Sequence, residues 1–179
     1  MNTIKRKLNI FKRRKIDKKI DNVFSWIKGA ELVELKSCNI TEDPVRPELD
    51  VIFRTSYGRK IFGVKYKKEI CAIMCFGFTD EVPTTVKELD LMTRDAYLRS
   101  VRRDQNIGKI AIAYTIWSKK KGGGKLIVKE VFKMIKKSNH LNRLITLSPL
   151  TEMARNFHLN NEAIELQVNE ETQNFEYKI

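Results

Sequence analysis

The chain has 179 residues, a formal net charge of +13 and three cysteines. Its length favours one compact domain, and an odd number of cysteines without framework spacing argues against a disulfide scaffold. With only two histidines beside them, Cys38, Cys71 and Cys75 are expected to be buried free thiols, and no metal site is expected. The apolar runs are shorter than the ~18 residues of a membrane span and no secretory signal is recognisable, so a cytoplasmic location is expected.

The positive charge is concentrated near the N-terminus. Residues 1–19 hold nine Lys or Arg and one acidic residue, a net of +8, so the other 160 residues carry only +5. This distribution predicts a basic N-terminal segment over residues 1–15 and a single domain over residues 16–179, and it argues against a wholly basic nucleic-acid-binding body. Residues 1–19 could serve an anionic partner, either nucleic acid or a membrane surface, or form a solvated tail.

The first half of the chain predicts one helix followed mainly by strands. Apolar residues between positions 16 and 27 recur at helical spacing, and Gly29 is placed to end that helix. Residues 30–37 are a candidate strand, and the turn residues at 56–58 and 67–69 divide the next stretch into predicted strands over residues 49–55, 60–67 and 69–79. Apolar spacing over residues 86–101 predicts a helix, or two short ones.

The second half alternates strands with helices. The expected elements are a strand over residues 109–117, a helix over 125–137, a strand over 144–147, a helix from Pro149 to about Leu159, and hairpin strands over 163–168 and 173–179. Proline suits the first helical position, which makes Ser148 the expected N-cap of the last helix.

Three consecutive glycines, at positions 122, 123 and 124, separate the apolar strand from its helix. A glycine-rich turn that opens a helix exposes backbone N–H groups at the positive end of the helix dipole, which is an arrangement that binds phosphate. Four lysines add cations there: Lys119, Lys120, Lys121 and Lys125. The loop has neither the P-loop spacing nor G-x-G-x-x-G. By itself it is compatible with phosphate binding or with a flexible turn carrying solvated lysines.

This order of elements, together with two motifs, resembles the Gcn5-related N-acetyltransferase (GNAT) superfamily. The superfamily's loop [Gln/Arg]-x-x-Gly-x-[Gly/Ala], after its fourth strand, is matched by residues 119–124, with Lys119 in place of Gln or Arg. Its next motif, roughly Asn-x-x-Ala-x-x-Phe-Tyr-x-x-x-Gly-Phe, is matched in spacing by residues 151–163. Here Thr151 replaces Asn and His158 replaces Tyr, while Glu-Ala stands for Gly-Phe.

The resemblance covers residues 109–179 well and residues 49–79 loosely. It implies a GNAT-like α/β fold: a central mixed sheet with splayed fourth and fifth strands, flanking helices and a C-terminal β-hairpin. It also implies an acyl-CoA co-substrate, foremost acetyl-CoA, between the splayed strands, with its diphosphate on the glycine loop. The cofactor-binding residues implied are Trp117, Ser118, Lys119, Lys120, Lys121, Gly122, Gly123, Gly124 and Lys125.

The resemblance implies direct transfer of the acyl group to an amine on a protein or small molecule that the sequence does not identify. His158, at the superfamily's tyrosine position, is the candidate general acid, and a capping role at the helix end is its alternative. Ser148 could contact the thioester or the acceptor, or serve only as the N-cap. The general base is unassigned, with Asp104 and Glu81 as weak candidates.

Two other functions compete with acyl transfer. One is a catalytically silent GNAT-like scaffold that binds nucleic acid through its basic N-terminal segment. The other is an acyl-CoA decarboxylase on the same fold. Binding of acyl-CoA would distinguish either enzyme from the scaffold. Formation of product without an acceptor amine would distinguish decarboxylation from acyl transfer.

Overall fold

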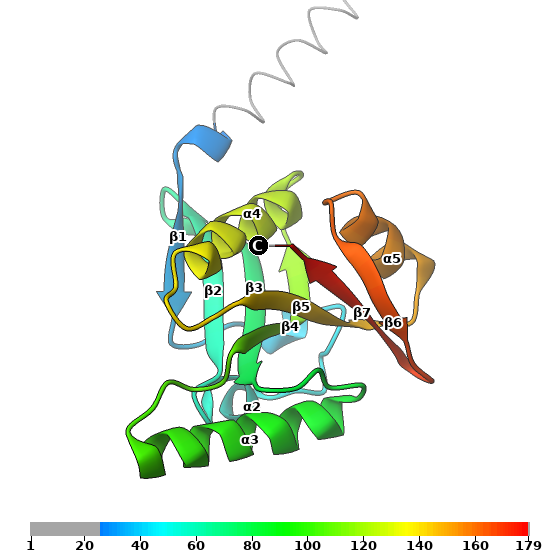
Figure 1. The fold of residues 1–179 in the computed structure, drawn as a ribbon. Coiled ribbons are helices and arrows are strands. Elements are labelled where there is room, and N and C mark those ends of the chain that lie inside the picture. The colour runs from blue at the N-terminus through cyan, green and yellow to red at the C-terminus, as the bar shows by residue number, and fades with distance from the viewer. Residues whose placement is uncertain (1–25, 179) are drawn as a thin grey trace, which may run out of the picture.

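The computed structural model describes residues 26–178 and shows a seven-stranded sheet with helices on both faces (Figure 1). The elements in chain order are β1 (Ala30–Leu35), the 3-10 helix η1 (Ile40–Glu42), α2 (Val51–Thr55), β2 (Lys60–Tyr66), β3 (Glu69–Thr79), α3 (Val86–Arg103), β4 (Ile110–Ser118), α4 (Gly123–Lys136), β5 (Arg143–Pro149), α5 (Glu152–Leu159), β6 (Ile164–Val168) and β7 (Thr172–Tyr177). The predicted basic segment and most of the first predicted helix lie outside the described residues. Helical residues 26–28 are followed by Gly29, as expected.

The strand order is β1-β2-β3-β4-β5-β7-β6, and the sheet is mixed because β4 and β5 run parallel while the other neighbours are antiparallel. The parallel pairing is short: it joins only residues 110–113 of β4 to residues 143–146 of β5. Beyond it the two strands separate, since β4 continues along β3 and β5 continues along β7. The predicted mixed sheet, the splayed pair of strands and the C-terminal hairpin are therefore confirmed.

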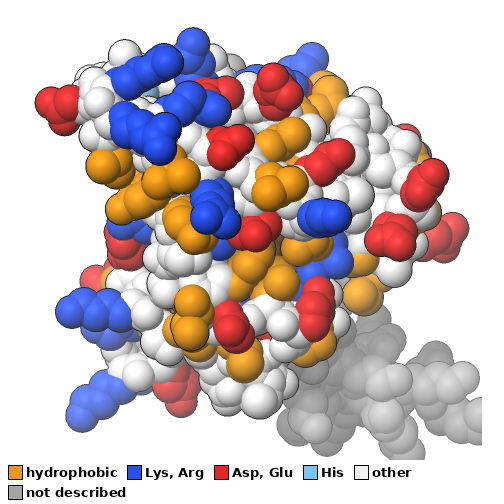
Figure 2. Space-filling model, turned by 90° about the horizontal axis from the view of Figure 1, so that it is seen from below, with side chains coloured by type: hydrophobic (Ala, Val, Ile, Leu, Met, Phe, Trp, Pro, Cys, Tyr) orange, Lys and Arg blue, Asp and Glu red, His pale blue; other side chains and the backbone are white. Residues whose placement is uncertain are grey.

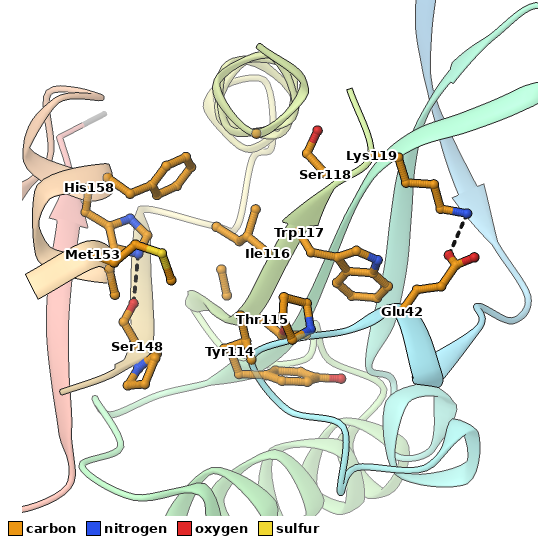
Figure 3. A pocket seen from close by; sticks show the side chains of 17 residues that line it. Glu42, Tyr114, Thr115, Ile116, Trp117, Ser118, Lys119, Ser148, Met153 and His158 are labelled. Carbon is orange, nitrogen blue, oxygen red and sulfur yellow. Dashed lines mark hydrogen bonds and ion pairs between the residues drawn. The ribbon is translucent and has the colours of Figure 1, made fainter. Parts of the chain in front are cut away.

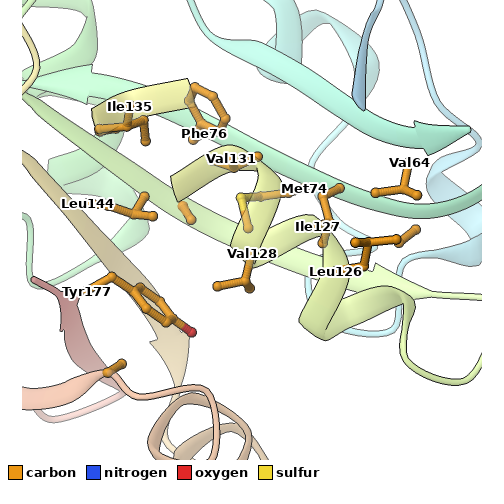
Figure 4. Packing of buried hydrophobic residues seen from close by; sticks show 14 of the residues in the cluster. Val64, Met74, Phe76, Leu126, Ile127, Val128, Val131, Ile135, Leu144 and Tyr177 are labelled. Carbon is orange, nitrogen blue, oxygen red and sulfur yellow. The ribbon is translucent and has the colours of Figure 1, made fainter. Parts of the chain in front are cut away.

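Each face of the sheet has its own hydrophobic core, because successive side chains of a strand point to opposite faces. On one face α4 buries Ile127, Val131 and Ile135 fully against the sheet (Figure 4). On the other face α3 buries Leu89, and Phe53 of α2 packs against the same cluster. Burial of a side chain of this size contributes about 1.5–3 kcal/mol to stability, so α4 is held firmly and its first turn is well positioned.

The strand predicted over residues 49–55 is wrong, because α2 (Val51–Thr55) forms there. The Asp50 carboxylate accepts a hydrogen bond from the Phe53 amide at 2.6 Å and so caps this short helix. The β-branched and aromatic residues that favoured a strand form part of a helix whose Arg54 is fully buried. An aspartate directly before an apolar run was the available signal.

Ser148 is not a helix cap, which corrects the prediction for the start of the last helix. β5 continues through Pro149, and Ser148 pairs with Gln173 of β7. α5 begins three residues after Pro149, where the Ala154 amide donates to Thr151 Oγ1 at 3.2 Å. The Ser148 hydroxyl is therefore free for another role.

The three cysteines are free thiols, with Cys71 and Cys75 buried and Cys38 half-buried. Within residues 26–178, no three His, Cys, Asp or Glu side chains are grouped so that they could hold a metal ion. The helices of the same part of the chain are all too short or too polar to cross a membrane.

Candidate functional site

A cavity of about 350 Å³ opens where β4 and β5 separate (Figure 3). β4 forms its floor, α5 and the end of β5 form one wall, and the loop before α2 forms the opposite wall. The lining residues are Glu42, Pro44, Val45, Ala113, Tyr114, Thr115, Ile116, Trp117, Ser118, Lys119, Gly124, Ser148, Pro149, Met153, Ala154, Phe157 and His158. A largely apolar cavity with a few convergent polar groups is typical of a site for a small molecule or cofactor.

The glycine loop meets this cavity at Gly124. α4 begins two residues earlier than predicted, so Gly123 and Gly124 belong to its first turn, and Gly122 precedes it with a φ of 84° that favours glycine. A Cβ on Gly124 would lie 3.0 Å from Cε2 of Phe157, across the cavity. The amides of Gly124 and Lys125 lie in a helical turn whose N–H groups have no carbonyl partner within the helix. They are therefore suited to an anionic ligand.

Gly123 has a packing role in addition to its predicted place in the cofactor site. Its amide donates to the Lys120 carbonyl at 3.0 Å, so it is not free for a ligand in this structure. The residue is buried against β3, where an added Cβ would collide with Ser118 Oγ and lie 3.2 Å from the Cβ of Ala72. Gly123 is thus required for close packing of α4 on the sheet.

Two of the four loop lysines are paired with carboxylates. Lys119 Nζ lies 2.5 Å from Glu42 Oε2, and Lys120 Nζ lies 2.9 Å from Glu69 Oε2. Of the predicted cofactor residues, the cavity is lined by Trp117, Ser118, Lys119 and Gly124, whereas Lys120, Lys121, Gly122, Gly123 and Lys125 lie beside it in the loop and first turn.

His158 lies at the cavity wall but is only 4% exposed. Its Nε2 is 2.8 Å from Ser148 Oγ and its Nδ1 is 2.9 Å from the Tyr177 hydroxyl, while the ring stacks on Phe175 at a centroid distance of 4.9 Å. Burial lowers the pKa of His158 to about 4. The imidazole is therefore neutral at neutral pH, and an imidazolium acid at this position is not supported.

Ser148 Oγ is the polar atom that this arrangement presents beside the cavity. It contacts His158 Nε2 at 2.8 Å (Figure 3) and Thr146 Oγ1 at 3.1 Å. A neutral imidazole has one donor and one acceptor nitrogen, so it can exchange protons between the hydroxyls of Ser148 and Tyr177. Hydrogen bonding between a hydroxyl and an imidazole is the arrangement that activates serine for chemistry.

The segment before α2, which comprises the end of η1 and the loop that follows it, was not predicted to reach the site, yet it supplies the wall opposite Ser148. Asp43 fixes this loop: its carboxylate pairs with Arg54 at 2.8 Å, with both side chains fully buried, and accepts from Thr115 Oγ1 of β4 at 2.8 Å. It also accepts from the amides of Val45 and Arg46. Glu42, directly before Asp43, is thereby held at the cavity.

Comparison with known proteins finds similar folds but no similar sequence. No family model matches the chain, and no curated protein matches its sequence. Among solved structures, an acetyltransferase of Bacillus subtilis in complex with CoA superposes with a TM-score of 0.57 at 9% identity, over 84% of this chain and 99% of that one. A GNAT family acetyltransferase of Elizabethkingia anophelis with acetyl-CoA bound gives 0.51 at 8% identity, with the same two shares. The chain has the GNAT fold.

A malonyl-CoA decarboxylase of Cupriavidus metallidurans also superposes on this GNAT fold, with a TM-score of 0.50 and 20% identity. The match covers 76% of this chain, which spans only 36% of the length of that decarboxylase. At 8–20% identity these similarities establish the fold of this chain, whereas the activities named are those of the neighbouring structures.

Neither weak candidate for the general base lines the cavity of this GNAT fold. Asp104 ends α3 in a left-handed conformation, and the Glu81 carbonyl accepts from Thr79 Oγ1 at 2.6 Å in the loop after β3. Among the described residues, Glu42 is the only carboxylate that lines the cavity. Sequence reasoning missed it because the loop before α2 lies outside both superfamily motifs.

The buried neutral His158 predicts a loss of stability in acid. Its pKa is about 4 in the folded chain and about 6.5 when unfolded, so the unfolded chain binds more protons between these values. As the pH falls from 6.5 to 4, we expect this group to remove up to about 3 kcal/mol of stability. Urea unfolding at pH 7.5 and 4.5 should show a smaller difference for His158→Gln, whereas the exposed control His140→Gln should match the wild type. An unchanged difference in His158→Gln would contradict the prediction.

Proposed function

We propose that the chain is an acyl-CoA-dependent N-acyltransferase, with acetyl-CoA as the foremost donor, that transfers the acyl group directly to an amine. The observation that carries this proposal is the cavity between the separated strands β4 and β5, which meets the first turn of α4 at Gly124 and the Ser148–His158 pair at its wall. The GNAT fold supports it, since neighbours of this fold were solved with CoA or acetyl-CoA.

The cavity offers complementary groups to each part of an acyl-CoA. The amides of Gly124 and Lys125 suit the diphosphate, and the part of β4 that does not pair with β5 offers backbone groups to the pantetheine amides. Two buried polar atoms of lining residues, Tyr114 Oη and Trp117 Nε1, have no hydrogen-bond partner among the described residues. Buried polar groups are normally hydrogen-bonded, so a bound ligand is a natural partner for them.

The reaction needs two proton transfers, one from the acceptor amine and one to the departing thiolate, and their costs differ. A lysine-like amine with a pKa of about 10.4 must lose a proton before it attacks, at a cost of about 4.6 kcal/mol at pH 7. Protonating the departing thiolate, with a pKa near 8.5, is worth only about 2 kcal/mol. In the proposed reaction the Ser148 hydroxyl, held by His158 Nε2, donates a proton to the departing sulfur and takes up a proton that the acylated nitrogen loses.

The proposal is tested first by binding and then by transfer. Isothermal titration of the wild type with acetyl-CoA should show a single site, and mass spectrometry of a lysate incubated with labelled acetyl-CoA should show products that require the protein. A well-folded protein that does not bind acetyl-CoA would remove the basis for an acyltransferase.

A second candidate is decarboxylation of a malonyl-type acyl-CoA. The hydroxyl–imidazole pair at the cavity and the likeness to a malonyl-CoA decarboxylase favour it. Release of carbon dioxide and acetyl-CoA from malonyl-CoA without any amine distinguishes it from acyl transfer.

Ser148→Ala should lower kcat for acyl transfer by about 30-fold, which corresponds to about 2 kcal/mol, with acyl-CoA affinity little changed, because it removes the proton donor beside the cavity. Ser138→Ala is the matched control, since its hydroxyl bonds to the exposed His140 at 3.1 Å, away from the cavity. Steady-state kinetics with the preferred donor measures both variants. A Ser148→Ala enzyme with unchanged kcat, under conditions where chemistry limits the rate, would exclude this role.

The scaffold alternative depends on residues 1–19, which lie outside the described part of the chain. The face seen in Figure 2, from the side of α3, shows acidic and basic side chains interspersed with apolar ones. This face therefore gives no support to a uniformly basic surface for nucleic acid.

A further inference from the structure

We propose that Glu42 is the general base for the acceptor amine, and that the phosphate groups of the donor release it by drawing Lys119 away. This inference rests on the proposed acyl transfer and names the group that the chemistry still lacks. The Glu42–Lys119 ion pair forms in the absence of ligand, and binding of acyl-CoA replaces it with a contact between Lys119 and phosphate.

Glu42 is the candidate base because it lines the cavity and because the other titratable side chains there are unsuited to the role. Four titratable side chains line the cavity in the described part of the chain: Glu42, Tyr114, Lys119 and His158. Burial raises the pKa of Tyr114 far above neutrality, and both ring nitrogens of His158 are held by hydroxyl groups. Lys119 is a cation and has no acceptor. A carboxylate is therefore the one group here that can both attract an ammonium and accept its proton.

The anchoring of the neighbouring residue gives Glu42 a fixed position. Asp43 is tied to Arg54 and to Thr115 of β4, and these contacts join the loop to the cavity floor. The Glu42 side chain itself remains 35% exposed, and Lys119 remains 48% exposed. The backbone is thus held while the two side chains are free to change partners.

Phosphate and Glu42 compete for the same cation. Lys119 Nζ lies 2.5 Å from Glu42 Oε2, and Lys119 begins the loop that leads to the Gly124 amides. Lysine binds phosphate as a point charge, so a diphosphate on these amides attracts Lys119. Once Lys119 has moved to the phosphate, the oxygen of Glu42 that it contacted is free to accept a hydrogen bond from the acceptor ammonium.

The acceptor ammonium gives one proton to the Glu42 carboxylate, and the resulting neutral nitrogen attacks the thioester carbonyl carbon. A C–N bond forms and the C–S bond breaks with its electron pair on sulfur. The thiolate takes a proton from the Ser148 hydroxyl, and the second proton that the acylated nitrogen loses replaces it on Ser148. Glu42 returns its proton to solvent, so one proton is released for each amide formed.

Two probe amines test the role of Glu42 as a base. Nα-acetyl-lysine amide is protonated at pH 7 and needs a base, whereas hydroxylamine is largely uncharged and does not. Glu42→Gln should lower kcat for the lysine probe by about 100-fold or more but change kcat for hydroxylamine by less than about threefold. The matched control is Glu69→Gln, which removes the neighbouring Glu69–Lys120 pair outside the cavity and should leave the ratio of the two rates unchanged. Equal losses for both amines, or no loss for lysine, would overturn the assignment.

CoA binding tests the exchange separately and needs no acceptor. Glu42→Gln should bind CoA roughly two- to fivefold more tightly than the wild type, because Lys119 no longer has to leave a carboxylate. The effect should vanish in the Lys119→Met background, where the double variant should match Lys119→Met alone. Unchanged CoA affinity in Glu42→Gln would refute the exchange. A wild type that binds acetyl-CoA but acetylates neither amine would instead count against the proposed acyl transfer.

Discussion

Gly124→Val is expected to abolish acetyl-CoA binding while the protein stays folded. The new side chain would project from the first turn of α4 toward Phe157 and fill the end of the cavity where the diphosphate is proposed to lie. At 100 times its Kd, a ligand adds about 2.7 kcal/mol to the stability of a protein that binds it only when folded. The wild type should gain this stabilisation with acetyl-CoA and the variant should not, as measured by calorimetry and thermal unfolding.

A valine placed at another position of the same helix provides the control. Lys129→Val places an identical side chain on the exposed side of α4, away from this cavity, and should leave acetyl-CoA affinity within about twofold. The unliganded Gly124→Val protein should unfold cooperatively. If Gly124→Val bound acetyl-CoA as tightly as the control, the cavity would not be the diphosphate site.

Arg54→Met is expected to cause the largest loss of stability, about 3–5 kcal/mol, because it leaves the Asp43 carboxylate buried without its cation. Arg54 also donates to the carbonyls of Leu49 and Arg46, so its loss should loosen the loop that carries Glu42. Urea unfolding at pH 7.5 measures the effect, and transfer activity should fall together with it.

Arg99→Met is the matched control for this ion pair. Arg99 pairs with Asp80 at the same distance of 2.8 Å, but its side chain is 47% exposed, so the loss should stay below about 1 kcal/mol. A similar small loss in Arg54→Met would show that the Asp43–Arg54 pair does not hold the loop.

The sequence by itself determined the features that depend on local pattern. Continuous apolar runs located the strands at residues 69–79 and 109–117, because a strand covered on both faces is apolar throughout. Alternation located the C-terminal hairpin, and turn residues marked the strand over residues 60–67. The glycine loop and the spacing of the motif around His158 pointed to the GNAT fold. The strand predicted over residues 49–55 failed because a single capping carboxylate outweighed a weak β preference in a short segment.

Only the tertiary structure decided which side chains meet at the cavity. Asp43 and Thr115 are 72 positions apart, and His158 and Tyr177 are 19 apart, so neither contact follows from local spacing. The motif spacing made His158 the candidate general acid, but its burial keeps the imidazole neutral. The Ser148 hydroxyl lies beside the cavity because β5 continues through Pro149. Glu42 reached the site only because a buried ion pair fastens its loop to β4, and burial of that pair depends on the packing of distant segments.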